Sequence, residues 1–163
     1  MAVPKTRKYT GTADGTAKGK RAGTEEFVKQ ITKLSDGALW NNGTWIVRNK
    51  MGKTTLSVHA TGRAMDLSYR KLGDKGKPDG RKYAEQIMEL LVANNLTLGV
   101  ECILDYWEGH GRGWRCDRQA WQVYTKPTIT GAPGGDWIHV EISPTMADSP
   151  PKVVDAFANL TKT

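Results

Sequence analysis

The chain has 163 residues, of which 38% are hydrophobic, and a formal net charge of +7 at pH 7. This length suits a single domain with its own core, and the sequence contains no apolar run of about 18 residues that could cross a membrane. The positive charge favours polyanionic partners such as nucleic acid, anionic lipid or the anionic polymers of a bacterial wall, and by itself it does not choose among them.

The N-terminal part of the chain differs in composition from the rest. It is rich in lysine, arginine, threonine, glycine and alanine and has almost no apolar side chains. With so little to bury, residues 1–23 are expected to be a flexible basic arm ahead of a folded domain, residues 24–163. The domain is predicted to begin with a helix that Thr24 caps and that Glu25 and Glu26 favour through the helix dipole. The apolar stripe of this helix consists of Phe27, Ile31 and Leu34.

Strands and helices then alternate without a regular βαβ rhythm. Short apolar or alternating runs predict strands at residues 45–47, 65–69, 99–104 and 137–142. Helical spacing predicts a helix at 81–95 and a last one after Pro150-Pro151. The stretch 107–121, rich in glycine, arginine and tryptophan, predicts a loop or hairpin. This mixture favours one α+β domain with a small, mainly antiparallel sheet and helices packed around it.

One stretch of the sequence, SVHATGRAMD, has residue types that suit a metal site. Its histidine and its aspartate, His59 and Asp66, are seven residues apart. If the chain turns at Gly62 and returns as a strand, both side chains can converge on one point. Imidazole nitrogens and carboxylate oxygens are both good zinc ligands. The stretch therefore predicts two ligands of a zinc ion.

A second stretch, DWIHVE, supplies another histidine and another carboxylate. His139 would complete a set of three protein ligands and leave a position open for water, as catalytic zinc requires. Asp136 follows a Pro-Gly-Gly sequence, so it can lie at an irregular strand entry and turn toward the metal. A carboxylate near the metal but not bound to it can accept the proton of the attacking water, and this general-base role fits Asp136.

Together, the two stretches have the pattern SxHxxGxAxD followed by DxxH. This pattern resembles that of the zinc peptidases that include D-alanyl-D-alanine carboxypeptidases and phage L-alanyl-D-glutamate endolysins, whose fold is shared by the signalling domain of hedgehog proteins. The resemblance covers roughly residues 24–145. It implies that zinc is bound by His59, Asp66 and His139, and it assigns the catalytic base to Asp136. Many members have glutamate at that last position, so the aspartate favours the phage endopeptidase branch.

A peptidase of this kind also needs a cation that stabilises the oxyanion of the transition state. In the carboxypeptidase branch, an arginine upstream of the zinc histidine has this role, and Arg48, eleven residues before His59, is the first candidate. Arg63 and Arg115 are the other candidates. The residues expected to contact substrate are Ser57, His110, Trp114 and Arg115.

The two cysteines, Cys102 and Cys116, have no CxxC spacing and no nearby cluster of histidines. They therefore predict neither a zinc ribbon nor a redox motif. A disulfide between them would need an oxidising compartment, and we expect two reduced, partly buried thiols with a structural role.

These features predict a zinc peptidase that cuts peptidoglycan peptides, with a basic surface that can also bind anionic wall polymers. The N-terminus lacks the apolar run of a secretory signal. We therefore expect a monomer, made in the cytoplasm, that reaches the bacterial wall by holin-type release or as part of a phage particle. Endopeptidase and carboxypeptidase activity both fit the residues, on L-Ala–D-Glu, D-Ala–D-Ala or diaminopimelate bonds.

Two other functions remain open from the sequence. A zinc-bound domain without catalysis could bind a partner or the wall, as hedgehog-type domains illustrate, although the presence of Asp136 argues against it. A nucleic-acid-binding protein could use the basic arm and the stretch rich in arginine and tryptophan, but the sequence contains no recognised nucleic-acid motif.

Overall fold

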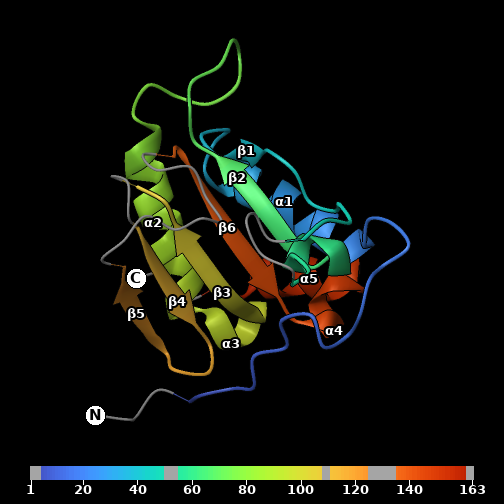
Figure 1. Cartoon of the computed structure of the whole chain (residues 1–163). Helices are drawn as coiled ribbons and strands as arrows, with labels where there is room; N and C mark the ends of the chain where they lie inside the picture. Colours follow the sequence, from blue (N-terminus) through green and yellow to red (C-terminus); the bar gives the residue numbers. More distant parts are fainter. Residues whose placement is uncertain (1–4, 50–54, 108–110, 125–134, 161–163) are drawn as a thin grey trace.

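The computed structural model describes residues 5–49, 55–107, 111–124 and 135–160 of the chain, and its centre is a six-stranded sheet (Figure 1). The strands are β1 (Trp40–Asn41), β2 (Ala64–Ser68), β3 (Val100–Asp105), β4 (Arg112–Arg115), β5 (Ala120–Val123) and β6 (Trp137–Ile142). Their order in the sheet is β1-β2-β6-β3-β4-β5, and every neighbouring pair is antiparallel. The predicted α+β class with an antiparallel sheet is therefore confirmed.

The helices lie mainly on one face of this sheet, with α1 and α2 behind it in the view of Figure 1. They are α1 (Ala22–Leu34), the 3-10 turn η1 (Val58–Thr61), α2 (Gly80–Ala93), α3 (Asn95–Leu98), α4 (Pro144–Ala147) and α5 (Pro150–Ala158). Phe27 of α1 and Phe157 of α5 meet edge to face, with ring centroids 4.9 Å apart. The helices predicted at 81–95 and after Pro150 correspond to α2 and α5.

The two faces of the sheet differ because side chains alternate along each strand. Leu67 and Val140 point toward the helices and are fully buried in the apolar core. Asp66 directly precedes Leu67, and His139 directly precedes Val140, so both point to the opposite face. That opposite face, called the second face below, is covered by η1 and by the N-terminal segment, residues 5–21.

The described part of the predicted basic arm lies against the domain. Residues 5–21 contain no helix or strand, but Arg7 N donates to Cys116 O at 3.0 Å and Ala17 N donates to Ala60 O at 2.9 Å. The segment is thus packed, in contrast to the flexible arm that its composition predicts. The prediction rests on the lack of apolar side chains. The segment is held instead by backbone groups and a few polar side chains, which composition does not reveal.

Two predicted elements also differ from the observed structure. Thr24 does not cap α1: it lies inside the helix, and its hydroxyl donates to Gly62 O at 2.6 Å. The predicted strand at 45–47 is not part of the sheet. This apolar run lies beside η1 instead, where Ile46 N donates to His59 O at 3.4 Å and the Ile46 side chain is half-exposed.

Both cysteines are buried and free of a disulfide in this structure, and their redox state stays a prediction. Cys116 belongs to the apolar core, whereas Cys102 of β3 lies opposite Glu141 in the sheet and shares the second face. Cys116 also contacts the N-terminal segment, where its Sγ lies 3.6 Å from Arg7 O and 3.7 Å from Lys8 O.

Candidate metal centre

Three side chains that the sequence predicts as metal ligands meet on the second face of the sheet. His59 Nε2 and His139 Nδ1 each lie 3.2 Å from Asp66 Oδ1, and the two imidazole rings are 5.0 Å apart. One ligand atom from each residue can be chosen so that all three lie within 4.8 Å of one another. Within the described ranges, this cluster has the spacing of side chains that could hold a metal ion.

The local fold explains how residues seven positions apart converge. Ser57 Oγ accepts a hydrogen bond from His59 N at 3.2 Å and caps η1. Gly62 ends this turn with a φ of 76°, a left-handed conformation that glycine adopts without strain. The chain then enters β2, where Asp66 lies directly opposite His139 of β6. The predicted turn at Gly62 and the strand after it are both confirmed.

Contacts behind each histidine decide which nitrogen faces the cluster. His59 Nδ1 lies 2.5 Å from Thr44 O, and His139 Nε2 lies 2.7 Å from Glu141 Oε2. A carbonyl or carboxylate oxygen can only accept, so these two nitrogens carry the proton and donate it. The other nitrogen of each ring is left facing Asp66. Such outer contacts fix the tautomer and orientation of metal-binding histidines, so the donor set fits a divalent metal ion.

Charge in the cluster favours a cation at its centre. Burial lowers the pKa of His139, but hydrogen bonds to Asp66 and Glu141 outweigh this effect and raise that pKa from 6.5 to about 10. Burial raises the pKa of Asp66, yet hydrogen bonds to His139 and His59 hold it far below its ordinary value. The carboxylates thus stabilise positive charge between the rings, and a metal ion would replace the proton there.

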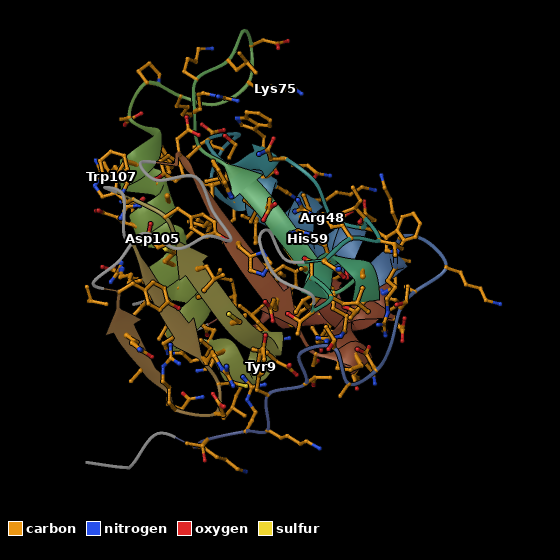
Figure 2. All side chains as sticks on the ribbon, in the orientation of Figure 1. Tyr9, Arg48, His59, Lys75, Asp105 and Trp107 are labelled. Carbon is orange, nitrogen blue, oxygen red and sulfur yellow. The ribbon has the colours of Figure 1, made fainter. Side chains whose placement is uncertain are left out.

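The cluster opens into a cavity of about 210 Å³. Besides the three cluster residues, its lining includes Tyr9, Arg48, Ser57, Tyr106, Arg115 and Glu141. Figure 2 shows Arg48 beside His59, with Tyr9 on the N-terminal segment below them. The cavity therefore combines a buried group of potential metal ligands with two arginines and several hydroxyl groups.

Three of the other predicted site residues line this cavity. They are Arg48, Ser57 and Arg115. Arg48 is exposed, and its carbonyl accepts a hydrogen bond from Ser57 N at 2.9 Å. Arg115 is held by Asp117, through Nε at 3.1 Å and Nη2 at 2.6 Å, and its guanidinium lies 3.9 Å from the centre of the Tyr9 ring.

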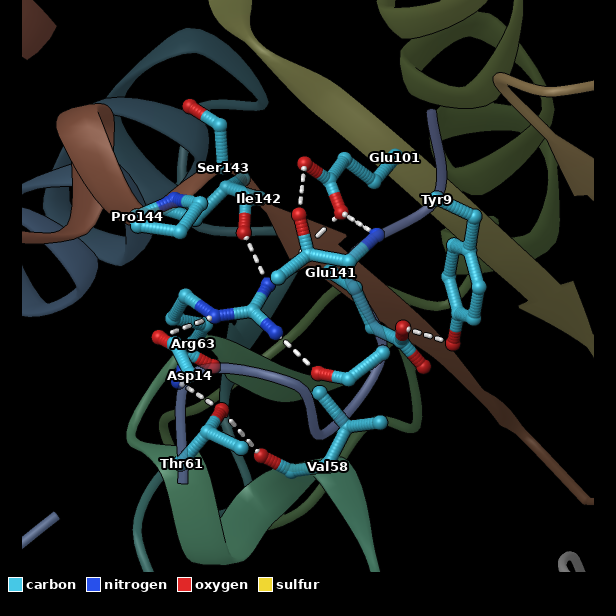
Figure 3. A network of polar contacts seen from close by, with 12 residues as sticks. Tyr9, Asp14, Val58, Thr61, Arg63, Glu101, Glu141, Ile142, Ser143 and Pro144 are labelled. Atoms are coloured by element: carbon cyan, nitrogen blue, oxygen red, sulfur yellow. Dashed lines mark hydrogen bonds and ion pairs between the residues drawn. The ribbon is translucent and has the colours of Figure 1, made fainter. Parts of the chain in front are cut away.

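Three predicted site residues, Arg63, Trp114 and Asp136, lie away from the cavity, and His110 is outside the described residues. Arg63 is fully buried, and its donors meet Asp14 Oδ2 at 3.0 Å, Ile142 O at 2.6 Å and the carbonyl of Gly11 (Figure 3). These partners give Arg63 a structural role rather than the predicted catalytic one. Trp114 is 1% exposed and packs in the core, because it points to the opposite face from its neighbour Arg115.

The structure does not bring Asp136 to the cavity. This residue directly precedes β6, and its carbonyl accepts a hydrogen bond from Tyr69 N at 2.9 Å. Its partly exposed carboxylate faces Arg70 Nε at 3.7 Å. His139 lies three residue steps further along the extended chain, a distance of about 10 Å. The predicted swing of Asp136 toward the metal is thus absent from this conformation.

Two residues of the site escaped the prediction from sequence. Glu141 lies two residues after His139 on the same face of β6, so strand alternation after the DxxH pattern could have identified it. Tyr9 comes from the segment that composition marks as an arm, and no local pattern distinguishes it. Its hydroxyl donates to Glu141 Oε1 at 2.5 Å.

Comparison with known proteins gives no relative from which a role could be transferred. No protein-family model, curated protein or solved structure matches the chain. Among the described residues, no helix is long and apolar enough to span a membrane. The chemistry of the site is therefore argued from its residues: two oriented histidines and one aspartate that could hold a metal ion beside a cationic cavity.

Proposed function

We propose that this protein is a zinc-dependent peptidase that hydrolyses peptide bonds in bacterial peptidoglycan, as a phage lysin or lytic domain. The observation that carries the proposal is the cluster of His59, Asp66 and His139 at the base of a cavity. Three protein ligands that face an accessible space are typical of catalytic zinc, whereas a structural zinc is enclosed by four. The resemblance of the sequence pattern to zinc peptidases of the cell wall, with their hedgehog-type fold, supports the same choice.

Zinc bound here would act as a Lewis acid that activates water and the scissile carbonyl. The residues of the chain would do the rest. Arg48 and Arg115 line the cavity and offer positive charge to the oxyanion of the transition state or to a carboxylate of the substrate. Stem peptides of peptidoglycan carry such carboxylates, so a cavity with two arginines suits them. Ser57 can offer its hydroxyl to the substrate only if it leaves its bond to His59 N.

Two carboxylates are candidates for the proton acceptor, and we assign the role to Asp136. Glu141 lines the cavity, but its two oxygens accept hydrogen bonds from Tyr9 and His139, so it is already engaged. Within the part of the chain that the structure describes, the Asp136 carboxylate has a long ion pair with Arg70, at 3.7 Å, and its side chain is about one third exposed. In the proposed reaction it turns from Arg70 to the cavity, accepts the proton of water and returns it to the leaving amine.

A zinc-bound binding domain without catalysis is the second candidate. The position of Asp136 outside the cavity favours it, because such a domain needs no proton acceptor. Under this alternative, the arginines of the cavity would hold an anionic partner or wall polymer.

The first experiment measures metal content and cleavage on the same purified protein. Muropeptides are incubated with and without a chelator, and the fragments are identified by mass spectrometry. We expect about one zinc per chain and cleavage that the chelator abolishes, and the fragment masses identify the bond. Zinc without cleavage would support the binding domain instead. If neither zinc nor cleavage is found, the proposal fails.

A further inference from the structure

We propose that Tyr9, on the N-terminal segment, is a positioning residue of the metal centre that acts through Glu141 on His139. The inference rests on the metal binding that the proposed function requires, but not on hydrolysis of any peptide. It makes the segment before α1 a part of the site, although its composition predicts a separate arm.

A continuous chain of contacts joins Tyr9 to the cluster. Tyr9 Oη donates to Glu141 Oε1 at 2.5 Å, as the dashed line in Figure 3 shows, and His139 Nε2 donates to Glu141 Oε2 at 2.7 Å. His139 then presents Nδ1 to Asp66 at 3.2 Å. Each oxygen of the Glu141 carboxylate thus has one partner, and the carboxylate cannot rotate without losing both. Because Glu141 is buried and bonded on both sides, its bond to Tyr9 helps to fix the orientation of His139.

The backbone on either side of Tyr9 is fixed as well. Thr10 donates to Glu101 through its N and its Oγ1, both at 2.9 Å. Glu101 lies where the register of β3 against β6 shifts, and such a bulge turns a side chain away from its regular direction. Arg63 donates to the carbonyl of Gly11. These contacts come from β3 and from the residue that directly precedes β2, so the elements next to the proposed ligands also hold the segment.

The ring of Tyr9 is fixed by Arg115, whose guanidinium lies 3.9 Å from the ring centre. This contact leaves the hydroxyl pointing at Glu141, which is 3% exposed. Burial and the negative charge of Glu141 raise the pKa of Tyr9, so the phenol stays protonated and remains a donor. Removing the hydroxyl alone would leave Glu141 Oε1 buried without this donor, and Glu141 would then be free to turn away from His139.

The test is a double-mutant cycle on zinc affinity. We compare the zinc affinity of the wild type with that of Tyr9→Phe, Glu141→Ala and the double variant, by competition with a chromophoric chelator. Co²⁺ absorption spectra report the ligand geometry. Loss of an outer-shell partner weakens metal binding by about 10–100-fold, so we expect that effect for Glu141→Ala and roughly 3–10-fold for Tyr9→Phe. In the Glu141→Ala background, Tyr9→Phe should have no further effect, because nothing is left to position.

Tyr83→Phe is the matched control, since Tyr83 lies on α2 and contacts Lys77 instead of the cavity. Circular dichroism melting checks that each variant is folded, and the Tyr9→Phe ring preserves the stacking on Arg115. Unchanged zinc affinity in Tyr9→Phe, or an equal loss in both backgrounds, would overturn the inference. Normal zinc binding by a wild type that cuts no peptide would instead overturn the proposed function and leave the inference standing.

Discussion

A buried aspartate and a partly buried one on opposite faces of the same sheet show how similar residues acquire different roles. Asp105, at the end of β3, accepts two hydrogen bonds from Arg81, at 2.8 and 2.9 Å, and another from Arg112 at 3.2 Å. Asp66, in β2, has His59 and His139 as partners, each at 3.2 Å. Figure 2 shows Asp105 beside Trp107 and away from His59.

The partners, rather than the burial or the pKa, distinguish the two sites. The pKa of both aspartates is lowered despite burial, so a shifted pKa does not distinguish the candidate metal centre from the other site. The guanidinium groups around Asp105 do not lose their protons, and they neutralise its charge permanently. The imidazoles around Asp66 can release a proton and offer a lone pair. A buried carboxylate among histidines can therefore bind a metal ion, whereas one among arginines holds the fold together.

The largest expected difference between the two aspartates is in zinc binding. Asp66→Asn removes a charged ligand, and we expect at least a 100-fold loss of zinc affinity, measured by chelator competition and metal analysis after dialysis. Asp105→Asn should keep about one zinc per chain in the folded protein. If both variants kept zinc equally well, the assignment of Asp66 as a ligand would be wrong.

A third aspartate, Asp136, should affect the rate of cleavage and not the binding of zinc. Asp136→Asn should bind zinc normally but lower the rate of muropeptide cleavage by roughly 100-fold or more, because the proton acceptor is lost. Metal content and the cleavage rate are measured on the same sample. Arg70→Gln is the matched variant: it releases Asp136 from its ion pair without removing the carboxylate, and it should retain activity. Full activity of Asp136→Asn would exclude this residue as the base.

Asp105→Asn, which should leave zinc binding intact, should lower the stability of the fold. Asp105→Asn leaves Arg81 and Arg112 without their shared carboxylate, and we expect a loss of roughly 2–4 kcal/mol in the free energy of unfolding. Urea denaturation measures the change. Asp155→Asn, at an exposed position of α5, should be nearly neutral. A comparably small effect of Asp105→Asn would show that its arginine contacts contribute little.

The contribution of Asp105 to the free energy of unfolding should also depend on pH. Burial raises the pKa of Asp105, but hydrogen bonds from Arg81 and Arg112 outweigh it and hold the pKa below the ordinary value of 3.8. Its contribution to stability is therefore complete above pH 3.8 and is lost as the pH falls through the lowered pKa of the folded state. The difference in urea midpoint between wild type and Asp105→Asn should be constant from about pH 6 to about pH 5 and should shrink as the pH is lowered further to about pH 3. A difference that stays constant over this whole range would contradict the assignment.

The smallest expected effect concerns substrate binding. Arg115→Gln removes one positive charge from the cavity, and loss of one charge-assisted hydrogen bond of roughly 1.5 kcal/mol should raise KM for a carboxylate-bearing stem peptide about tenfold. Lys152→Gln removes the same charge from an exposed position on α5 and should leave KM unchanged. Equal KM values for Arg115→Gln and the wild type would place the substrate elsewhere in the cavity.

Local sequence patterns predicted which three side chains meet in the cluster, because these patterns encode turns and strand faces. The spacing from His59 to Asp66 requires one turn, and Gly62 provides it with a left-handed conformation. His139 lies in a strand whose alternation can be read from the residues themselves. Apolar stripes also predicted α2 and α5, since burial of one helix face follows the 3.6-residue period.

Tertiary structure decided everything that depends on a partner far away in the chain. It buried Arg63 against Asp14 and Gly11, placed Trp114 in the core, and left Asp136 beside Arg70. It also brought Tyr9 to Glu141, which lies 132 residues further along the chain. Periodicity tells which way a side chain points along its own element, whereas the group that it meets depends on how distant elements pack. The sequence by itself therefore determined the three candidate ligands, and only the packing of the N-terminal segment on the sheet determined what orients them.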